Sequence, residues 1–241
     1  MPHRARILLW LVALASSNCN ATYDPAPGGK PLHVLFVGNS LTYTESIPEI
    51  VQRLATAGGQ RMFYDAWLQP NYSLEDHWND GLAREIERQK PDIVVLQQGP
   101  TSQPDSRVDL IYWTQKIDSV VQGIGSRSAL YMVWPPLSSS QLFFAVRDNY
   151  AAAAEAVHGM LMPAGVTWLE IWNRDPNIEL YGPDGFHPAY LGALAAAETI
   201  YVMLFNVPAD GIPSLDDGVP PGIRTIIKEA VAASVAQWGR H

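Results

Sequence analysis

Short apolar segments alternate with longer amphipathic segments along most of the chain. Apolar runs of this length, several of them apolar at every position, are typical of strands buried on both faces of a parallel sheet. We predict five strands, over residues 33–37, 62–68, 93–96, 128–133 and 166–171. Helical spacing of apolar residues predicts helices over residues 47–57, 74–89, 107–122, 143–162, 188–205 and 223–238. With right-handed crossovers, this order predicts an α/β fold: a single-domain, doubly wound α/β/α sandwich around a five-stranded parallel sheet.

The first 22 residues differ from the rest of the chain. Arg4 and Arg6 precede an apolar run over residues 7–15, and small residues follow it. This is the layout of a secretory signal peptide, and the run is shorter than the roughly 20 residues that span a bilayer. Cys19 offers a second interpretation, a lipidated cysteine, although Asn18 is a poor residue before that modification. We therefore predict export to the periplasm or the cell exterior, with no membrane span.

Residues 23–31 contain three prolines and two glycines and read as a linker. The folded domain is therefore expected over residues 32–241. The chain carries 16 Lys and Arg against 24 Asp and Glu, a formal charge of −8, and shows no basic block. This composition argues against nucleic acid as a partner. One cysteine in 241 residues excludes an internal disulfide framework and a cysteine-based zinc site.

Two polar blocks lie where an α/β sheet binds ligands, outside the carboxyl ends of its strands. Ser40 follows the first predicted strand in the block GNSLT, and a serine there either caps a helix or exposes a nucleophilic hydroxyl. His187 stands three residues after Asp184 in DGFHP, just before a long predicted helix. A carboxylate so close in sequence can hold one imidazole nitrogen and leave the other facing a nucleophile. Together the blocks favour catalysis by Ser40, His187 and Asp184.

These two blocks resemble those of the SGNH (GDSL-type) hydrolase superfamily, over about residues 32–205. The resemblance implies a flavodoxin-like fold and a serine esterase that uses Ser40 as nucleophile, His187 as base and Asp184 as its partner. It also implies an oxyanion hole that includes the Ser40 amide. No metal site, phosphate loop or nucleotide motif is present, so we expect no cofactor. The absence of G-x-S-x-G weighs against the ordinary α/β-hydrolase fold.

The other two family blocks match less closely. After the second strand, the segment NYSLEDHW resembles the G-x-S-L-x-x-H-W pattern of an SGNH-like branch of often exported bacterial proteins, with Asn71 at the glycine position. Asparagine is a good replacement for glycine in a left-handed conformation, so we expect the Asn71 amide to serve the oxyanion hole. Where the family has Gly-x-Asn-Asp after the third strand, this chain has Gln97-Gln98-Gly99-Pro100. Gln98 is our preferred carboxamide donor and Gln97 the alternative.

Two other histidines need separate interpretations. His77 lies in the helix after the second strand, away from any Asp-x-x-His pattern, and we expect it to pack or to line the cleft. His158 is placed on the alanine-rich helix as a core or surface residue.

The substrate is expected to be a small-molecule or glycan ester. Resemblance to carbohydrate-deacetylating branches favours O-acetyl groups on carbohydrate, and five aromatic residues near the strand ends are candidates for stacking on sugars: Tyr43, Trp67, Tyr72, Trp78 and Trp134. A lipid or lysophospholipid ester is the second possibility. A non-catalytic glycan-binding protein that retains the fold is a third, and labelling of Ser40 by a fluorophosphonate distinguishes it from an enzyme.

Overall fold

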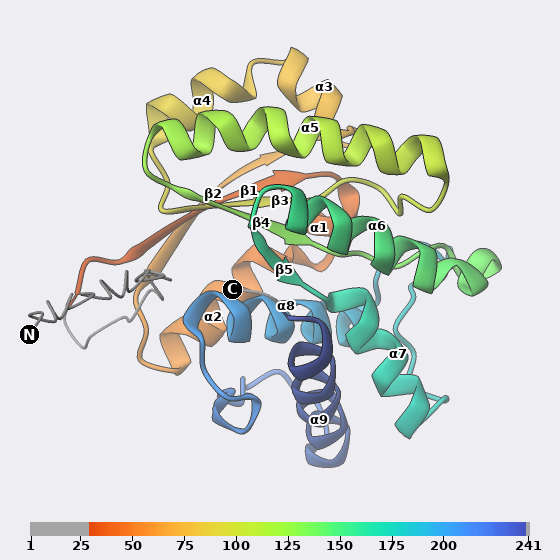
Figure 1. Ribbon diagram of the computed structural model, residues 1–241. Coiled ribbons are helices and arrows are strands. Elements are labelled where there is room, and N and C mark those ends of the chain that lie inside the picture. Colours follow the sequence, from red (N-terminus) through yellow and green to blue (C-terminus); the bar gives the residue numbers. More distant parts are fainter. Residues whose placement is uncertain (1–28, 240–241) are drawn as a thin grey trace, which may run out of the picture.

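A five-stranded parallel sheet forms the centre of the molecule (Figure 1). The computed structural model describes residues 29–239, so the predicted signal peptide and Cys19 lie outside the described residues. The strands stand in the order β2-β1-β3-β4-β5, and every neighbouring pair is parallel. Their bounds are β1 Leu32–Gly38, β2 Met62–Leu68, β3 Ile93–Leu96, β4 Arg127–Tyr131 and β5 Met160–Met162. The predicted doubly wound α/β fold is confirmed.

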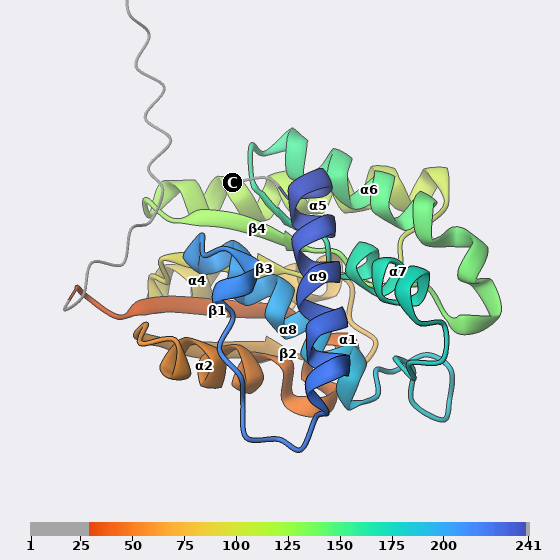
Figure 2. The same ribbon diagram turned by 90° about the horizontal axis from the view of Figure 1, so that it is seen from below.

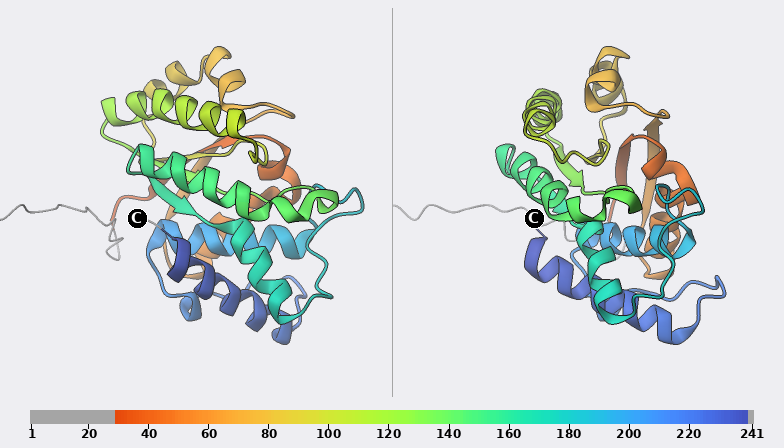
Figure 3. Two further views of the ribbon diagram at one scale, coloured as in Figure 1. Left: turned by 45° about the vertical axis from the view of Figure 1, so that its right-hand side comes forward. Right: turned by 90° about the vertical axis from the view of Figure 1, so that its right-hand side faces the viewer.

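Helices cover both faces of the sheet (Figures 2 and 3). One layer contains α3 (Leu74–Asn79), α4 (Leu82–Gln89), α5 (Pro104–Gly123) and α6 (Phe143–Ala156). The other contains α2 (Ile47–Ala57), α7 (Ala164–Arg174) and α8 (Tyr190–Phe205), with α9 (Pro221–Trp238) packed on α7 and α8. Short helical segments connect the rest: α1 (Ser40–Tyr43), η1 (Thr44–Ser46), η2 (Leu137–Leu142) and η3 (Ala209–Gly211).

The prediction of the fifth strand was wrong. Residues 166–171 belong to α7, and the strand is β5, three residues long, inside the segment predicted as the end of a helix. Helix α6 ends at Ala156, and His158 with φ 49° turns the chain toward β5. Valine, threonine and tryptophan favour strands as residues, but here packing in the second helical layer outweighs that preference.

The predicted helix over residues 74–89 is two helices. Gly81 adopts φ 99°, a left-handed conformation that a helix interior does not tolerate, and separates α3 from α4. At the other end of α3, its N-cap residue Ser73 lines the pocket that contains Ser40.

Helix α8 is buried around almost its whole circumference, between the sheet and its helical neighbours. Its small residues permit this close approach, and Gly192 permits the closest: a Cβ there would lie 2.2 Å from the Leu180 carbonyl oxygen. Within residues 29–239, no helix is both long and apolar enough to cross a bilayer.

Candidate active site

Ser40 is the first residue of α1, immediately beyond the end of β1. The side chain of Asn39 caps this helix by accepting a hydrogen bond from the Leu41 amide at 3.1 Å. The chain can turn tightly here because Gly38 has no Cβ, which would lie 2.4 Å from Gln97 Oε1. Ser40 is nearly buried, and within residues 29–239 neither its amide nor its hydroxyl has a hydrogen-bond partner. Both groups therefore remain available to a ligand.

Gln97 holds this turn in place. Its Oε1 accepts hydrogen bonds from the Asn39 amide and the Thr42 hydroxyl, both at 2.8 Å. Its Nε2 donates to Asn39 Oδ1 at 3.1 Å and to the Gln98 carbonyl at 2.6 Å. The side chain is completely buried. The Gln97 carboxamide thus forms hydrogen bonds that stabilise the loop carrying Ser40.

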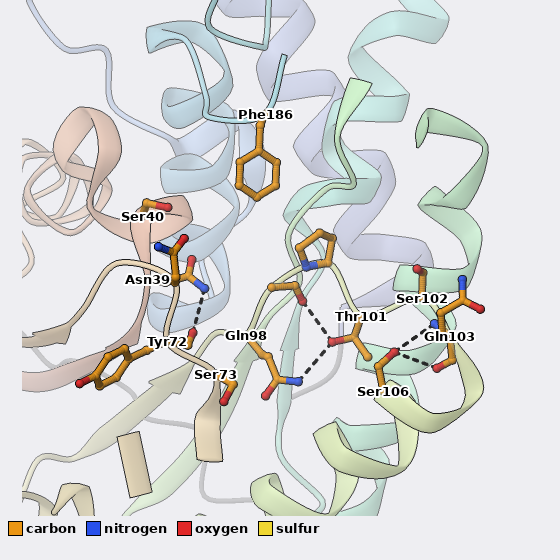
Figure 4. A pocket seen from close by; sticks show the side chains of 13 residues that line it. Asn39, Ser40, Tyr72, Ser73, Gln98, Thr101, Ser102, Gln103, Ser106 and Phe186 are labelled. Carbon is orange, nitrogen blue, oxygen red and sulfur yellow. Dashed lines mark hydrogen bonds between the residues drawn. The ribbon is translucent and has the colours of Figure 1, made fainter. Parts of the chain in front are cut away.

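Gln98 lies differently. Its side chain lines the pocket beside Ser40, where Oε1 accepts a hydrogen bond from the Leu74 amide at 3.1 Å (Figure 4). Its Nε2 has only a long contact, 3.4 Å, to the Thr101 hydroxyl. The Gln98 backbone is bonded through both its amide and its carbonyl to the Tyr150 hydroxyl, so a buried tyrosine fixes the loop after β3. The Gln98 amide group therefore remains free to turn a donor toward a ligand.

The loop after β2 brings a third group to the pocket. Asn71 has φ 63°, the left-handed conformation expected for a residue that replaces glycine, and it lines the pocket with Ser40. Its amide has no hydrogen-bond partner within residues 29–239. Asn39 Nδ2 donates to the Tyr72 carbonyl at 3.0 Å, which ties this loop to the Ser40 turn.

Asp184 and His187 form a hydrogen-bonded pair, with Oδ2 of the carboxylate 2.5 Å from Nδ1 of the ring. Because a carboxylate only accepts, Nδ1 is the donor and Nε2 is left for other chemistry. Asp184 Oδ1 also accepts from the Phe186 and His187 amides. The hydrogen bond from His187, supported by these two amides, lowers the pKa of Asp184 to about 2. Asp184 is therefore ionised throughout the neutral range.

The loop that carries this pair is braced at its base and its flank. The Gly182 amide donates to the His187 carbonyl at 2.8 Å, and the Ala189 amide donates to the Leu180 carbonyl at 2.9 Å. On the flank, Trp134 Nε1 donates to the Phe186 carbonyl at 3.0 Å. Trp134 is itself buried and stacked on Trp168, with ring centroids 3.6 Å apart. An aromatic cluster thereby fixes the loop.

The pocket beside Ser40 has a volume of about 460 Å³ (Figure 4). Four loops and the start of α5 form its walls, and no charged side chain lines it. The lining residues are Asn39, Ser40, Asn71, Tyr72, Ser73, Gln98, Gly99, Pro100, Thr101, Ser102, Gln103, Ser106 and Phe186. The Phe186 ring projects into the space above Gln98. Phe186 thus brings the Asp184–His187 loop to the pocket, although within residues 29–239 no hydrogen bond joins His187 to Ser40.

Several candidates lie elsewhere. His77 is buried and its Nε2 lies 2.9 Å from the Gly38 carbonyl, so it packs behind β1; burial lowers its pKa. His158 is exposed just beyond the end of α6, not on the helix. Of the five aromatic residues proposed to stack on sugars, Tyr72 lines the pocket, whereas Trp134 is a core residue.

Comparisons with known proteins agree on the architecture. The chain resembles a DUF4886 family protein from Bacteroides uniformis (17% identity, TM-score 0.75, covering 86% of this chain and 95% of that one). It also resembles a putative SGNH hydrolase from Slackia heliotrinireducens, with 20% sequence identity and a TM-score of 0.60. That match covers 71% of this chain and 98% of the other. A third similar structure is an acetyl xylan esterase, AlAXEase, with 14% sequence identity and a TM-score of 0.55. That match covers 70% of this chain and 98% of the other. The chain has the SGNH hydrolase fold.

No family model and no curated protein match the chain. In its SGNH fold, the loops after β1, β2 and β3 and the loop before α8 meet around one pocket. Four contributions were not anticipated from the sequence: the Asn39 bond to Tyr72, the anchoring of Gln98 by Tyr150, the brace from Trp134 and the position of Phe186. Asn39 and Phe186 do lie inside the two blocks that signalled the site. Tyr150 and Trp134 lie far in sequence from Gln98 and Phe186, the residues they contact, and no sequence motif indicated these contacts.

Proposed function

We propose that this protein is a serine esterase that hydrolyses carboxylic esters through an acyl-enzyme. The observation that carries the proposal is the Asp184–His187 pair, on a loop that contributes a wall to the pocket holding Ser40. The resemblance in fold to esterases agrees with it. Acyl transfer requires a nucleophile, an oriented base and donors for the oxyanion. Within residues 29–239, the Ser40 hydroxyl and the Ser40 and Asn71 amides have no hydrogen-bond partner, and Asp184 orients the His187 ring on the adjoining loop.

In the proposed reaction, His187 Nε2 takes the proton of Ser40 as its hydroxyl oxygen attacks the ester carbonyl carbon. Asp184 keeps His187 in the correct tautomer and stabilises the imidazolium. The amides of Ser40 and Asn71 and the Nε2 group of Gln98 donate to the oxyanion, each contributing about 3 kcal/mol to the transition state. Collapse of the intermediate expels the alcohol, which His187 protonates. Water then attacks the acyl-enzyme with His187 as base, releasing the acid and restoring Ser40.

The preferred substrate is an O-acetyl group on a carbohydrate. The pocket walls are rich in hydroxyl and carboxamide groups and carry no charged side chain, which suits a neutral, polar substrate. One of the proteins with a similar fold is an acetyl xylan esterase. For residues 1–22 we keep the proposal of an export signal, which places the enzyme where it meets extracellular glycans.

The deciding test compares wild-type protein with Ser40→Ala. Wild type should release p-nitrophenol from p-nitrophenyl acetate and react with a fluorophosphonate probe at Ser40, as mass spectrometry of the labelled peptide will show. Ser40→Ala should lose both activities and keep its thermal transition. Turnover that survives in Ser40→Ala would rule out Ser40 as the nucleophile. Folded wild-type protein that neither turns over nor labels would contradict the esterase proposal and favour the non-catalytic glycan-binding alternative. Acetate release from acetylated xylan then tests the substrate class.

A further inference from the structure

A second hollow lies on the other side of Phe186. It has a volume of about 620 Å³ and is lined by residues of two loops: Pro136, Leu137, Ser138, Pro183, Asp184, Gly185 and Phe186. Phe186 is the one described residue that lines both this hollow and the pocket of Ser40. The two spaces therefore meet at its ring.

Phe186 is held firmly in that position. Its amide donates to Asp184 Oδ1 at 2.9 Å, and its carbonyl accepts from Trp134 Nε1 at 3.0 Å. The Leu137 amide donates to the Gly185 carbonyl at 2.8 Å, which fixes the two loops of the second hollow to one another. The ring of Phe186 is half-buried and meets the His187 ring edge to face, with centroids 5.1 Å apart. A binding wall beside His187 is thus preformed.

The mechanism of ester cleavage indicates which part of a substrate lies beside His187 and Phe186. His187 must donate a proton to the departing alcohol oxygen, so that oxygen lies within hydrogen-bond reach of Nε2. The Phe186 ring, whose centroid lies 5.1 Å from that of His187, offers a neighbouring apolar surface to the carbon atoms attached to that oxygen. The acyl group is attached to the other side of the carbonyl carbon, away from the departing oxygen.

Resting on the proposed function, we infer that Phe186 and the second hollow form the subsite for the alcohol part of the ester, and that this part is a pyranose ring. Proline rings, Leu137 and the Phe186 ring supply apolar surface for the C–H face of a sugar, and Ser138 supplies a hydroxyl at its edge. Leu137 is 53% exposed, so this surface is accessible to a ligand.

The experiment separates the step that involves the alcohol from the step that follows its departure. Acylation is measured as kcat/KM for two acetate esters, an acetylated methyl xylopyranoside and methyl acetate, and deacylation as the single-turnover decay of the acetyl-enzyme. Phe186→Ala should lower kcat/KM about tenfold for the sugar ester and less than about twofold for methyl acetate, which has no ring to contact Phe186. Deacylation should be unchanged, because the alcohol has already left.

Phe144→Ala is the matched control, since Phe144 is 60% exposed on α6 and lines neither space. It should change none of the three rates. If Phe186→Ala loses its thermal transition, Phe186→Leu is compared in the same way. Equal losses for both esters, or slower deacylation, would show that Phe186 only positions His187 and would overturn the inference. Absence of turnover on every ester in wild type would overturn the proposed function itself, and the inference with it.

Discussion

Gln97 and Gln98 are adjacent and identical in chemistry, yet the fold gives them different tasks. Gln98→Ala should lower kcat on p-nitrophenyl acetate by a factor of about 10² to 10³, the usual effect of removing one oxyanion donor. Its thermal midpoint should change little, because the side chain makes one hydrogen bond to the Leu74 amide and one long contact. Steady-state kinetics and a melting curve on the same preparation measure both effects.

Gln97→Ala is the matched partner of that variant. It leaves the buried Asn39 amide and Thr42 hydroxyl without their acceptor, and each lost partner costs about 1–3 kcal/mol. We therefore expect a clear drop in the free energy of unfolding. A Gln98 variant with normal kcat would remove Gln98 from the proposed oxyanion hole.

His187 and Asp184 should differ in how much activity their loss removes. His187→Ala deletes the base, whereas Asp184→Asn keeps a hydrogen-bonding group beside Nδ1 and should retain more of kcat/KM. Because the pKa of Asp184 is about 2, its carboxylate stays charged well below neutral pH. The 13C carboxyl chemical shift of Asp184 should therefore stay at the value of an ionised carboxylate from pH 5 to pH 8. A shift to the value of a protonated carboxyl group within that range would show that Asp184 titrates there.

The local geometry of the candidate site was predictable from short sequence blocks. A hydrogen bond between residues 184 and 187 needs only a tight turn, and the left-handed conformation at Asn71 follows from its side chain. The choice between Gln97 and Gln98 depends instead on contacts across 50 to 60 residues of sequence, with Asn39 and Tyr150. No short segment contains that information.

Elements were predictable where the hydrophobic pattern or flanking breaks define their bounds. The bounds of β2, β3 and α2 agree with the hydrophobic pattern, and each has enough residues or flanking breaks to define it. Strand β5 has three residues, Met-Leu-Met, which are compatible with a helix and too few to show a period. Its place in the sheet is determined by pairing with β4, a contact that only the folded molecule makes.

Helix α8 provides a test of packing at this scale. Gly192→Ala would place a Cβ 2.2 Å from the Leu180 carbonyl oxygen and 2.5 Å from Trp168 Cζ2, in a region with no room to move. We expect a loss of about 1–3 kcal/mol or more in the free energy of unfolding. Gly222→Ala on α9 is the control, because its Cβ meets nothing within 4 Å. It should be neutral or stabilise by up to about 1 kcal/mol. Equal effects in urea denaturation would contradict this packing.

At the scale of the whole molecule, one buried charged cluster joins α8 to α9 and the segment before it. Glu198 on α8 is completely buried, and neither of its carboxylate oxygens has a hydrogen-bond partner within the part of the chain that the structure describes. Arg224 on α9 is 3.8 Å away but bonds instead to Asp217 and the Leu215 carbonyl. Tyr190, three residues after His187, donates to Asp217 at 2.8 Å. The cluster therefore connects α9 to the start of α8, the helix that follows the loop of Asp184 and His187.

This cluster should make stability depend on pH. Burial raises the pKa of Glu198 from 4.5 to about 8, because Arg224 attracts the carboxylate too weakly to offset its desolvation. A group whose pKa is raised by folding stabilises the protein below its unfolded pKa and loses that contribution as pH rises through its folded pKa. Relative to Glu198→Gln, wild type should lose stability between pH 4.5 and 8, by at most about 1.4 kcal/mol per pH unit. Urea unfolding at several pH values measures this difference, with Glu87→Gln on the exposed face of α4 as the control. A wild-type minus Glu198→Gln difference that is flat across this window would mean that Glu198 remains ionised and that Arg224 does compensate its charge.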